Sequence, residues 1–212
     1  MSIASTLLLE PSELSTSQIE SVLSLLMTPN VDYADLYFQN TFYESWALED
    51  SEIKGGTFNI DKGVGVRAVS QEKTGFAYTD DIAFSSLTDA ATAARSIVSL
   101  GETSSPKIYV APTSAIYYAS INPLDSFPTE KKLQLLTLVD TIARAEDPRV
   151  IQVNASLSGC YEIIMIANSE GRMNADIRPL VSLHVSVIVE LDAALSSKKS
   201  AEKIDKPSWG KV

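Results

Sequence analysis

The residue types that most often carry catalysis or bind transition metals are scarce in this chain. It holds one histidine, His184, and one cysteine, Cys160. Zinc-dependent hydrolysis needs at least three protein ligands and an open position for water. A serine or cysteine nucleophile would have to share His184 as its base, and no elbow or oxyanion motif accompanies such a pair. We therefore predict no catalytic residue and no metal site in this chain, and the sequence leaves the substrate-binding residues unknown.

Both residues have simple structural interpretations. His184 alternates with Ser182 and Ser186 along a stretch whose other side chains are apolar, which predicts a half-exposed histidine on the polar face of a strand. Cys160 lies between two strand-like segments and is expected to be a small buried residue. A single cysteine cannot form an internal disulfide.

Four acidic residues lie close together in the sequence: Glu44, Glu49, Asp50 and Glu52. Strand alternation would send Glu49 and Asp50 to opposite faces of a sheet, so a joint metal site is not expected. A solvated strand edge, whose charges discourage pairing with another edge, is the preferred interpretation.

One stretch could bind a ligand. Two sets of side chains alternate along it: Val64, Val66 and Ala68 on one face, and Gly63, Gly65 and Arg67 on the other. Glycines two residues apart in a strand indicate that something approaches the backbone closely. This could be a ligand or, more often, another part of the same protein. Arg67 could pair with a peptide carboxylate, although an exposed strand charge is commoner.

A group of six aromatic residues precedes this stretch: Tyr33, Tyr37, Phe38, Phe42, Tyr43 and Trp46. Aromatic rings can stack on a ligand, but at strand spacing they more often fill a core. The two strand glycines lack the third glycine and the helix of a dinucleotide site, and no phosphate-loop motif occurs.

The overall charge narrows the class of partner. The net charge of −10 and the pI of about 4.6 argue against a nucleic-acid surface. No apolar run is long enough to cross a membrane, so we expect a cytoplasmic protein with no membrane contact. The charge is uneven, because residues 194–212 are rich in Lys and Ser. We predict a domain over residues 1–193 and a flexible tail over 194–212.

Hydrophobic periodicity predicts an α+β fold: an antiparallel sheet with three main helices packed on one face. The expected helices run from Ser15 or Thr16 to about Met27, from Ser86 to Leu100 and from Thr129 to Ala145. The apolar stripe of the last helix is Leu133, Leu136, Val139, Ile142 and Ala143. The expected strands are Asp35–Asp50, Ile53–Ile60, Gly63–Ser70, Thr74–Thr79, Val150–Leu157, Tyr161–Asn168 and Leu180–Leu191. Residues 103–128, with four prolines, indicate an irregular connection.

Two long segments resemble a known family. They are YFQNTFYESWALEDSEIKGGTFNIDKGVGVRAVSQEKTGFAYTD and SLSGCYEIIMIANSEGRMNADIRPLVSLHVSVIVE. They closely resemble the N-terminal domain of TldD in the TldD/PmbA (TldE) metallopeptidases, and the similarity extends from about Asp32 to Glu190. In that family a later domain carries a helix with His-Glu-three residues-His, which binds zinc. This chain has no such motif.

The resemblance implies a role without catalysis. By resemblance, relatives form dimers that enclose a chamber, and this domain helps limit entry to unfolded peptides. The chain would then be a gating and assembly domain, inactive alone, with zinc expected only in the full-length enzyme. Its partner would be a TldD/PmbA (TldE)-type subunit or the missing catalytic domain. The alternative is a stand-alone module that binds peptides or proteins. The sequence does not distinguish a natural short protein from a frameshifted or truncated one.

Overall fold

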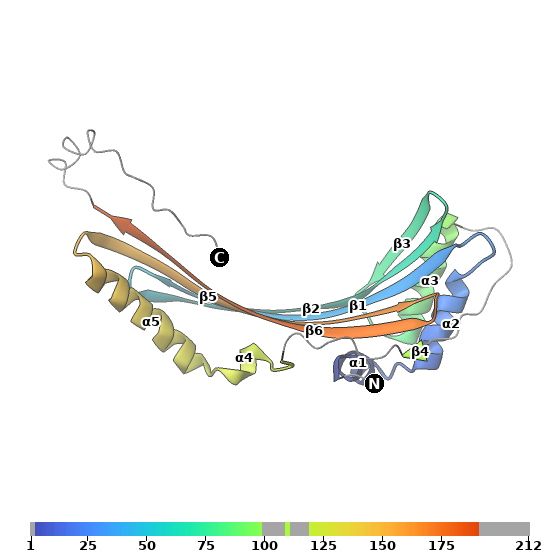
Figure 1. Ribbon diagram of the computed structural model, residues 1–212, viewed down its shortest axis with the longest axis horizontal. Helices are drawn as coiled ribbons and strands as arrows, with labels where there is room; N and C mark the ends of the chain where they lie inside the picture. Colours follow the sequence, from blue (N-terminus) through green and yellow to red (C-terminus); the bar gives the residue numbers. More distant parts are fainter. Residues whose placement is uncertain (1–2, 99–108, 111–118, 191–212) are drawn as a thin grey trace, which may run out of the picture.

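The computed structural model describes residues 3–98, 109–110 and 119–190. They form a long, strongly curved sheet with the strand order β3-β2-β1-β5-β6-β4. Every helix of the described ranges lies on the convex side of the sheet, and none of them lies on the concave side (Figure 1). The predicted α+β class, with an antiparallel sheet covered by helices on one face, is confirmed.

The strands are long and almost all antiparallel. Their bounds are β1 Tyr33–Glu49, β2 Glu52–Ser70, β3 Lys73–Thr79, β4 Tyr109–Val110, β5 Val150–Asn168 and β6 Arg172–Val189. Among the described strands, only the two-residue β4 is parallel to its neighbour, β6. Strands β1, β2 and β3 follow one another in the chain and pair in that order as an antiparallel meander.

Three predicted strand boundaries are wrong. Ile53–Ile60 and Gly63–Ser70 are parts of the single strand β2, because Asp61 and Lys62 between them pair with β1. The predicted gap between Leu157 and Tyr161 is likewise the middle of β5. The last predicted strand, which was expected to begin at Leu180, is β6 and begins at Arg172. Polar residues and glycine do not break a strand that pairs continuously with a neighbour, since the ladder hydrogen bonds belong to the backbone.

The helices were predicted more accurately. Their bounds are α1 Ile3–Leu9, a 3-10 turn at Glu10–Ser12, α2 Thr16–Leu26, α3 Phe84–Val98, α4 Pro123–Ser126 and α5 Thr129–Glu146. The three main predicted helices correspond to α2, α3 and α5. Ser15 begins α2 through a capping box with Gln18, in which each side chain bonds to the backbone of the other residue. No helix within the described ranges is long and apolar enough to cross a membrane.

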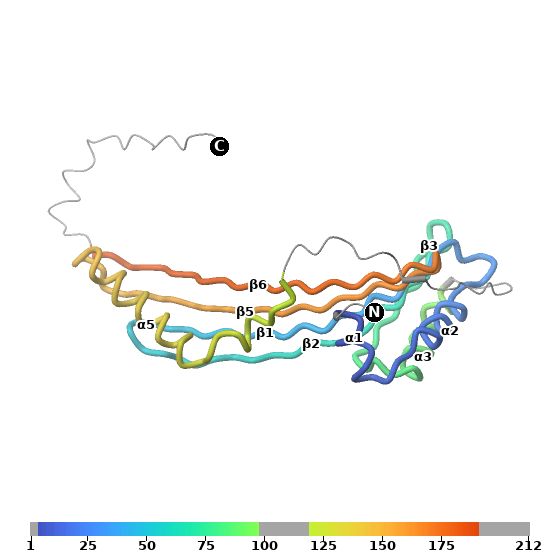
Figure 2. Tube along the Cα trace, turned by 60° about the horizontal axis from the view of Figure 1, so that its bottom comes forward, coloured from blue at the N-terminus to red at the C-terminus, as the bar shows by residue number. Residues whose placement is uncertain are grey.

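The helices form two groups at opposite ends of the sheet (Figure 2). At one end, α1, α2 and α3 cover the main core, whose fully buried side chains include Ile19, Leu23, Leu36, Phe38, Val66, Leu87, Ile163 and Met165. At the other end, α5 covers a small core of Leu48, Leu136, Ala155 and Leu157. The same strands therefore contribute to two separate cores.

Helix α5 packs on the sheet differently from the prediction. The residues it buries are Lys132, Leu136 and Asp140, spaced by four, while Ile142 is 57% exposed. Two polar residues can face the sheet because each has a partner: Lys132 pairs with Glu44, and Asp140 accepts a hydrogen bond of 2.8 Å from Ser51. An apolar stripe alone could not have identified this face.

Candidate binding groove on the concave face

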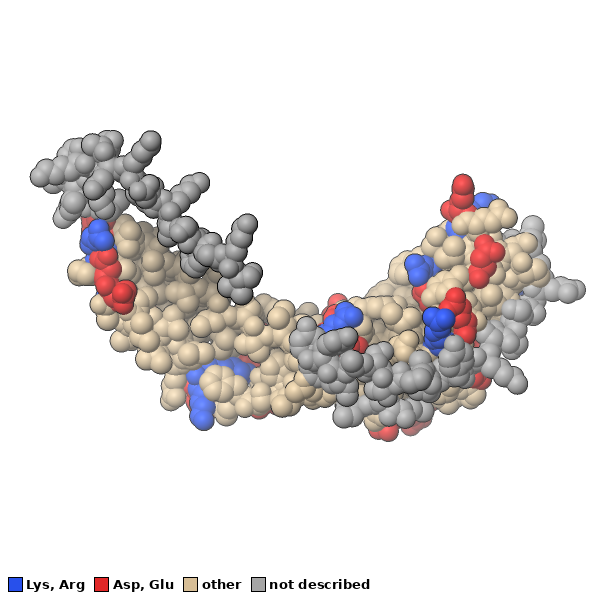
Figure 3. Space-filling model, in the orientation of Figure 1, with Lys and Arg blue, Asp and Glu red and all other residues tan. Residues whose placement is uncertain are grey.

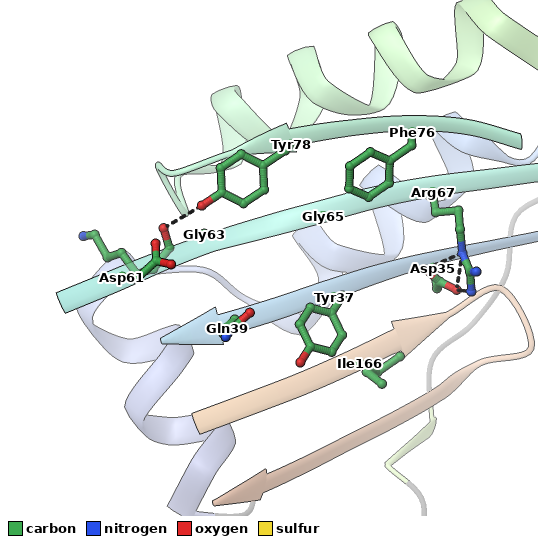
Figure 4. A pocket seen from close by; sticks show the side chains of 11 residues that line it. Asp35, Tyr37, Gln39, Asp61, Gly63, Gly65, Arg67, Phe76, Tyr78 and Ile166 are labelled. Atoms are coloured by element: carbon green, nitrogen blue, oxygen red, sulfur yellow. Dashed lines mark hydrogen bonds and ion pairs between the residues drawn. The ribbon is translucent and has the colours of Figure 1, made fainter. Parts of the chain in front are cut away.

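A groove with a volume of about 580 Å³ lies on the concave face, at the end of the sheet that carries the main core. It runs along β2, between side chains of β3 on one side and of β1 and β5 on the other (Figure 4). Its lining residues are Asp35, Tyr37, Gln39, Asp61, Lys62, Gly63, Gly65, Arg67, Phe76, Tyr78 and Ile166.

The floor of the groove is the backbone of Gly63 and Gly65. A Cβ atom at Gly63 would lie 2.6 Å from Cζ of Tyr78 and 2.7 Å from the carbonyl oxygen of Thr79, and one at Gly65 would lie 3.1 Å from Cε2 of Phe76. The close approach that the glycines indicate is therefore made by aromatic rings of the neighbouring strand. Phe76 and Tyr78 nevertheless stay 59% and 58% exposed, so each ring presents apolar surface to the groove.

The opposite wall is held rigidly in place. Tyr37 and Gln39 extend from β1, and the Gln39 amide donates hydrogen bonds to Glu162 at 2.9 Å and to Thr41 at 3.0 Å. Burial, together with the negative charge of Glu162, raises the pKa of the Tyr37 phenol. Tyr37 therefore stays protonated at neutral pH and can donate a hydrogen bond to a ligand.

One end of the groove is closed by an ion pair. Arg67 donates to Asp35, with Nε 3.1 Å from Oδ2, and its guanidinium lies 5.8 Å from the ring centre of Tyr33. The Asp35 carboxylate, through this hydrogen bond, raises the pKa of Arg67. Arg67 is an exposed strand residue, as predicted, with 47% of its side chain accessible, and its charge is already matched within the sheet by Asp35.

The other end of the groove is acidic. Asp61 lines it, and the Tyr78 hydroxyl donates a hydrogen bond of 3.1 Å to the carbonyl oxygen of Lys62. The groove therefore combines apolar ring surfaces with a phenol donor and a carboxylate. This chemistry suits apolar side chains on an extended chain, and it includes no nucleophile with a neighbouring base.

The predicted aromatic group is dispersed by the fold. Tyr37 reaches the groove and Tyr33 underlies Arg67, whereas Phe38 is fully buried in the main core. The ring of Phe42 lies 6.4 Å from that of Tyr161, Tyr43 is 40% exposed, and Trp46 packs against the small core. The groove rings that the sequence reasoning missed are Phe76 and Tyr78. Phe76 and Tyr78 lie two residues apart on the strand that follows the glycines. This spacing could have identified them, since aromatic side chains often cover glycine on a neighbouring strand.

His184 and Cys160 are not brought together. They lie on adjacent strands, but His184 pairs with Ser156 and Cys160 with Leu180, four residues from His184 along β6. Cys160 is half-buried and not fully buried as predicted, and His184 is exposed and not half-exposed. Within the described ranges no group of three or more His, Cys, Asp or Glu residues could hold a metal ion, so these residues do not fit a zinc site.

Glu49, Asp50 and Glu52 lie together at the turn between β1 and β2, where Glu49 pairs with Glu52. Glu44 lies farther along β1 and is not solvated. Glu44 forms an ion pair of 2.8 Å with Lys132, and its side chain is only 13% exposed. Asp50 pairs with Arg144 at 2.6 Å at the tip of the sheet. The prediction of a solvated edge is therefore wrong for Glu44, which a helix covers.

Comparisons with known proteins match most of the chain to one family. The family model described as PmbA/TldA metallopeptidase domain 1 matches residues 34–98, and the model of the central domain of the same family matches residues 122–205. Strands from both matched ranges lie side by side in one sheet, where β1 pairs with β5 from Asp35 to Glu49.

Individual relatives agree with this result. A metalloprotease TldD homolog of Haemophilus influenzae is 52% identical over 188 residues, which are 88% of this chain and 39% of that protein. A TldD homolog of Buchnera aphidicola is 45% identical over 183 residues, or 86% of this chain and 38% of the relative. The chain thus spans about two fifths of the length of these relatives.

A solved structure shares the fold. The crystal structure of TldE from Thermococcus kodakarensis superimposes with a TM-score of 0.59 at 12% identity, covering 82% of this chain and 40% of that one. This likeness concerns the architecture alone. Together with the matched models and relatives, it shows that the chain belongs to the TldD/PmbA metallopeptidase family and corresponds to its N-terminal region.

Proposed function

We propose that this chain is the substrate-receiving and assembly part of a TldD-type zinc metallopeptidase and that it does not cleave peptides by itself. The groove over Gly63 and Gly65 carries this proposal, because it offers apolar ring surfaces without a base and nucleophile in reach. Zinc and the hydrolytic groups would be supplied by a catalytic domain or by a TldE-type subunit.

The groove favours unfolded peptides for a physical reason. Extended chains place alternate side chains on one face about 7 Å apart, and this face could lie along β2. Large apolar side chains are mostly buried in folded proteins, so only an unfolded segment presents them to the Phe76 and Tyr78 rings. Binding of a peptide to this face would therefore select unfolded segments before hydrolysis.

Binding of a labelled peptide tests the proposal. The probe is a fluorescein-labelled ten-residue peptide of alternating Phe and Ser, compared with an alternating Gly and Ser peptide by fluorescence anisotropy. We expect the Phe76→Ser and Tyr78→Ser changes to weaken binding of the Phe peptide by about thirtyfold when combined, since stacking of each ring contributes on the order of 1 kcal/mol. The matched control is Phe58→Ser, because Phe58 is equally exposed, at 61%, on the convex face of β2.

The Phe58→Ser control also gives the result that would contradict the proposal. Equal loss of binding in the Phe58→Ser and groove variants would show non-specific apolar contact and would remove the support for a substrate groove. Unchanged thermal unfolding of each variant would confirm that binding, and not folding, was altered.

The second candidate is a stand-alone module that binds a protein partner by strand addition. The part of β6 from Pro179 to Val189 favours it, because it carries no Asp, Glu, Lys or Arg and its outer side pairs with no described strand. A peptidase assay with and without a TldE-type subunit separates the two candidates, because only the first predicts that the chain contributes to cleavage in the assembled enzyme. The cytoplasmic location and the flexible tail over residues 194–212 stay predictions from the sequence.

A further inference from the structure

One end of the concave groove is lined by oxygen atoms. The Asp61 carboxylate lies at this end, as does the Tyr78 hydroxyl, which donates its hydrogen bond to the carbonyl oxygen of Lys62 (Figure 4). A Cβ atom at Gly63 would lie 2.7 Å from the carbonyl oxygen of Thr79 and would also meet the Tyr78 hydroxyl. The missing side chain at Gly63 therefore leaves a floor with oxygen atoms around it.

The Asp61 carboxylate has no counter-charge. Asp61 is exposed, and no described residue forms a hydrogen bond or an ion pair with its carboxylate. Its cross-strand partner on β1 is the uncharged Thr41. Lys62 is the next residue, but its side chain leaves β2 from the convex face, because alternate residues of a strand point to opposite faces. A negative charge therefore faces the groove without a matching cation.

The opposite end of the groove differs, because its charges are already matched. There Arg67 is paired with Asp35, and the side chains that line the groove between the two ends are uncharged. Acidic and basic side chains lie interspersed on the visible face of this end of the molecule (Figure 3). Attraction for a cation in the groove is therefore a local property of the Asp61 end.

A primary ammonium group matches the Asp61 end in its chemistry. It carries three N–H donors, and the acceptors available are the Asp61 carboxylate, the Lys62 carbonyl oxygen and the Tyr78 hydroxyl oxygen. The ring of Tyr78 is 58% exposed, and the face of such a ring also attracts a cation. A metal ion fits less well, since no group of three or more His, Cys, Asp or Glu residues lies together in the described part of the chain.

The spacing of the rings favours the amino end of a peptide over a lysine side chain as the source of this ammonium group. Phe76 and Tyr78 are two residues apart on β3, and alternate side chains of an extended peptide have the same spacing, about 7 Å. With the α-ammonium group at Asp61, the first and third side chains of the peptide would reach the two rings. A lysine would instead place its four-carbon stem beside them and displace apolar side chains.

We propose that the groove binds peptides by their free amino end, with the α-ammonium group at Asp61 and the following residues extended along β2 toward Arg67. Asp61 and Arg67 are six residues apart on β2, or about 20 Å, so the groove holds about five residues of the peptide. This inference rests on the proposed function and adds a selection to it: the ends of unfolded chains bind in preference to internal segments.

Blocking the amino group of a peptide tests the proposal. The probe is Phe-Ser-Phe-Ser-Phe-Cys amide with fluorescein on the cysteine side chain, compared with its N-acetylated form by fluorescence anisotropy on the full chain. We expect acetylation to weaken binding about fivefold, because it removes the positive charge and leaves the apolar side chains unchanged. Asp61→Asn should weaken binding of the free peptide to the same extent and abolish the difference between the two forms.

Two controls make the test specific. Asp89→Asn removes the same charge from an exposed position of α3, on the convex side, and should leave the difference between the two peptides intact. An acetylated peptide with Lys in place of the first Phe offers an ammonium group without a free amino end, and it should bind no more tightly than the acetylated Phe peptide. Thermal unfolding should be unchanged in both Asn variants.

Three results would overturn the proposal: equal binding of the free and acetylated peptides, a difference between them that persists in Asp61→Asn, or an acetylated Lys peptide that binds as tightly as the free peptide. In each case the proposed function would stand if Phe76→Ser and Tyr78→Ser still weakened binding. If no peptide bound at all, both the proposed function and this inference would be wrong.

Discussion

Lys132 of α5 donates hydrogen bonds to both carboxylate oxygens of Glu44 on β1, with Nζ 2.9 Å from Oε1 and 2.8 Å from Oε2. The same ammonium group donates to the carbonyl oxygen of Leu124 in α4 at 2.7 Å. The two side chains are only 7% and 13% exposed. One lysine thus connects both helices at this end of the molecule to the sheet.

Removing one member of this pair should be costly. Lys132→Met leaves the Glu44 carboxylate buried without its counter-charge and should lower the free energy of unfolding by about 3–5 kcal/mol. The double variant Lys132→Met with Glu44→Leu should lose less, because no charge stays uncompensated. Urea unfolding followed by circular dichroism measures both. A double variant less stable than the single one would show that the pair itself, and not the avoided burial of a lone charge, stabilises this end.

The two groove glycines should respond differently to alanine. At Gly63 the new methyl group meets the carbonyl oxygen of Thr79 as well as the Tyr78 ring, and a backbone atom cannot move aside. At Gly65 it meets only the edge of the Phe76 ring, which is largely exposed and can rotate away. We expect a loss of about 1–3 kcal/mol for Gly63→Ala and less than about 1 kcal/mol for Gly65→Ala. Equal unfolding midpoints for the two variants would contradict the geometry of this floor.

The Cys160 thiol should react slowly. Burial, and then the nearby Glu162 carboxylate, raise the pKa of this thiol, so at pH 8 a smaller fraction is the reactive thiolate than in an unperturbed cysteine. Reaction with a disulfide reagent at pH 8 should be slower than that of free glutathione and should accelerate as the pH rises. Glu162→Gln removes one of the two causes and should increase the rate, while unfolding in guanidinium should remove the difference altogether. A native rate equal to that of glutathione would contradict this.

The chain alone should neither retain zinc nor cleave peptides. Its single histidine is exposed on β6, and no described residues supply a ligand set around it. After dialysis we expect less than one zinc ion per chain by elemental analysis, and no chelator-sensitive cleavage of an unfolded peptide. Stoichiometric zinc together with cleavage that a chelator abolishes would show that the prediction is wrong.

Helices and the fold class could be predicted from the sequence because their signals are local. Ser15 with Gln18 marks the start of α2, and the apolar spacing through Leu26 gives its buried face. The face of α5 could not be predicted, since Lys132 is buried only because Glu44, distant in sequence, lies opposite it. Burial of a charged residue depends on a partner that local periodicity does not contain.

Only part of the groove could be predicted, because some of its contacts also depend on how distant strands align. Gly63 and Gly65 indicated close approach from the sequence, and the structure confirms it. The identity of the approaching group, Phe76 and Tyr78, depends on the register between β2 and β3. Likewise Arg67 has its partner in Asp35 only because β1 and β2 align in one register, which strand alternation does not fix.

The separation of the molecule into two cores on shared strands has a consequence for cooperativity. Strands β1 and β5 are each anchored at one end by a large core and at the other by a core of four buried residues, one of which, Leu136, belongs to α5. The second end therefore has far less apolar burial to hold it, and it can open as a local unit while the first end stays folded. Amide protons of Ala155 and Leu157 should then exchange faster than those of Ile163 and Met165 on the same strand, so that one unbroken β5 would show two levels of protection.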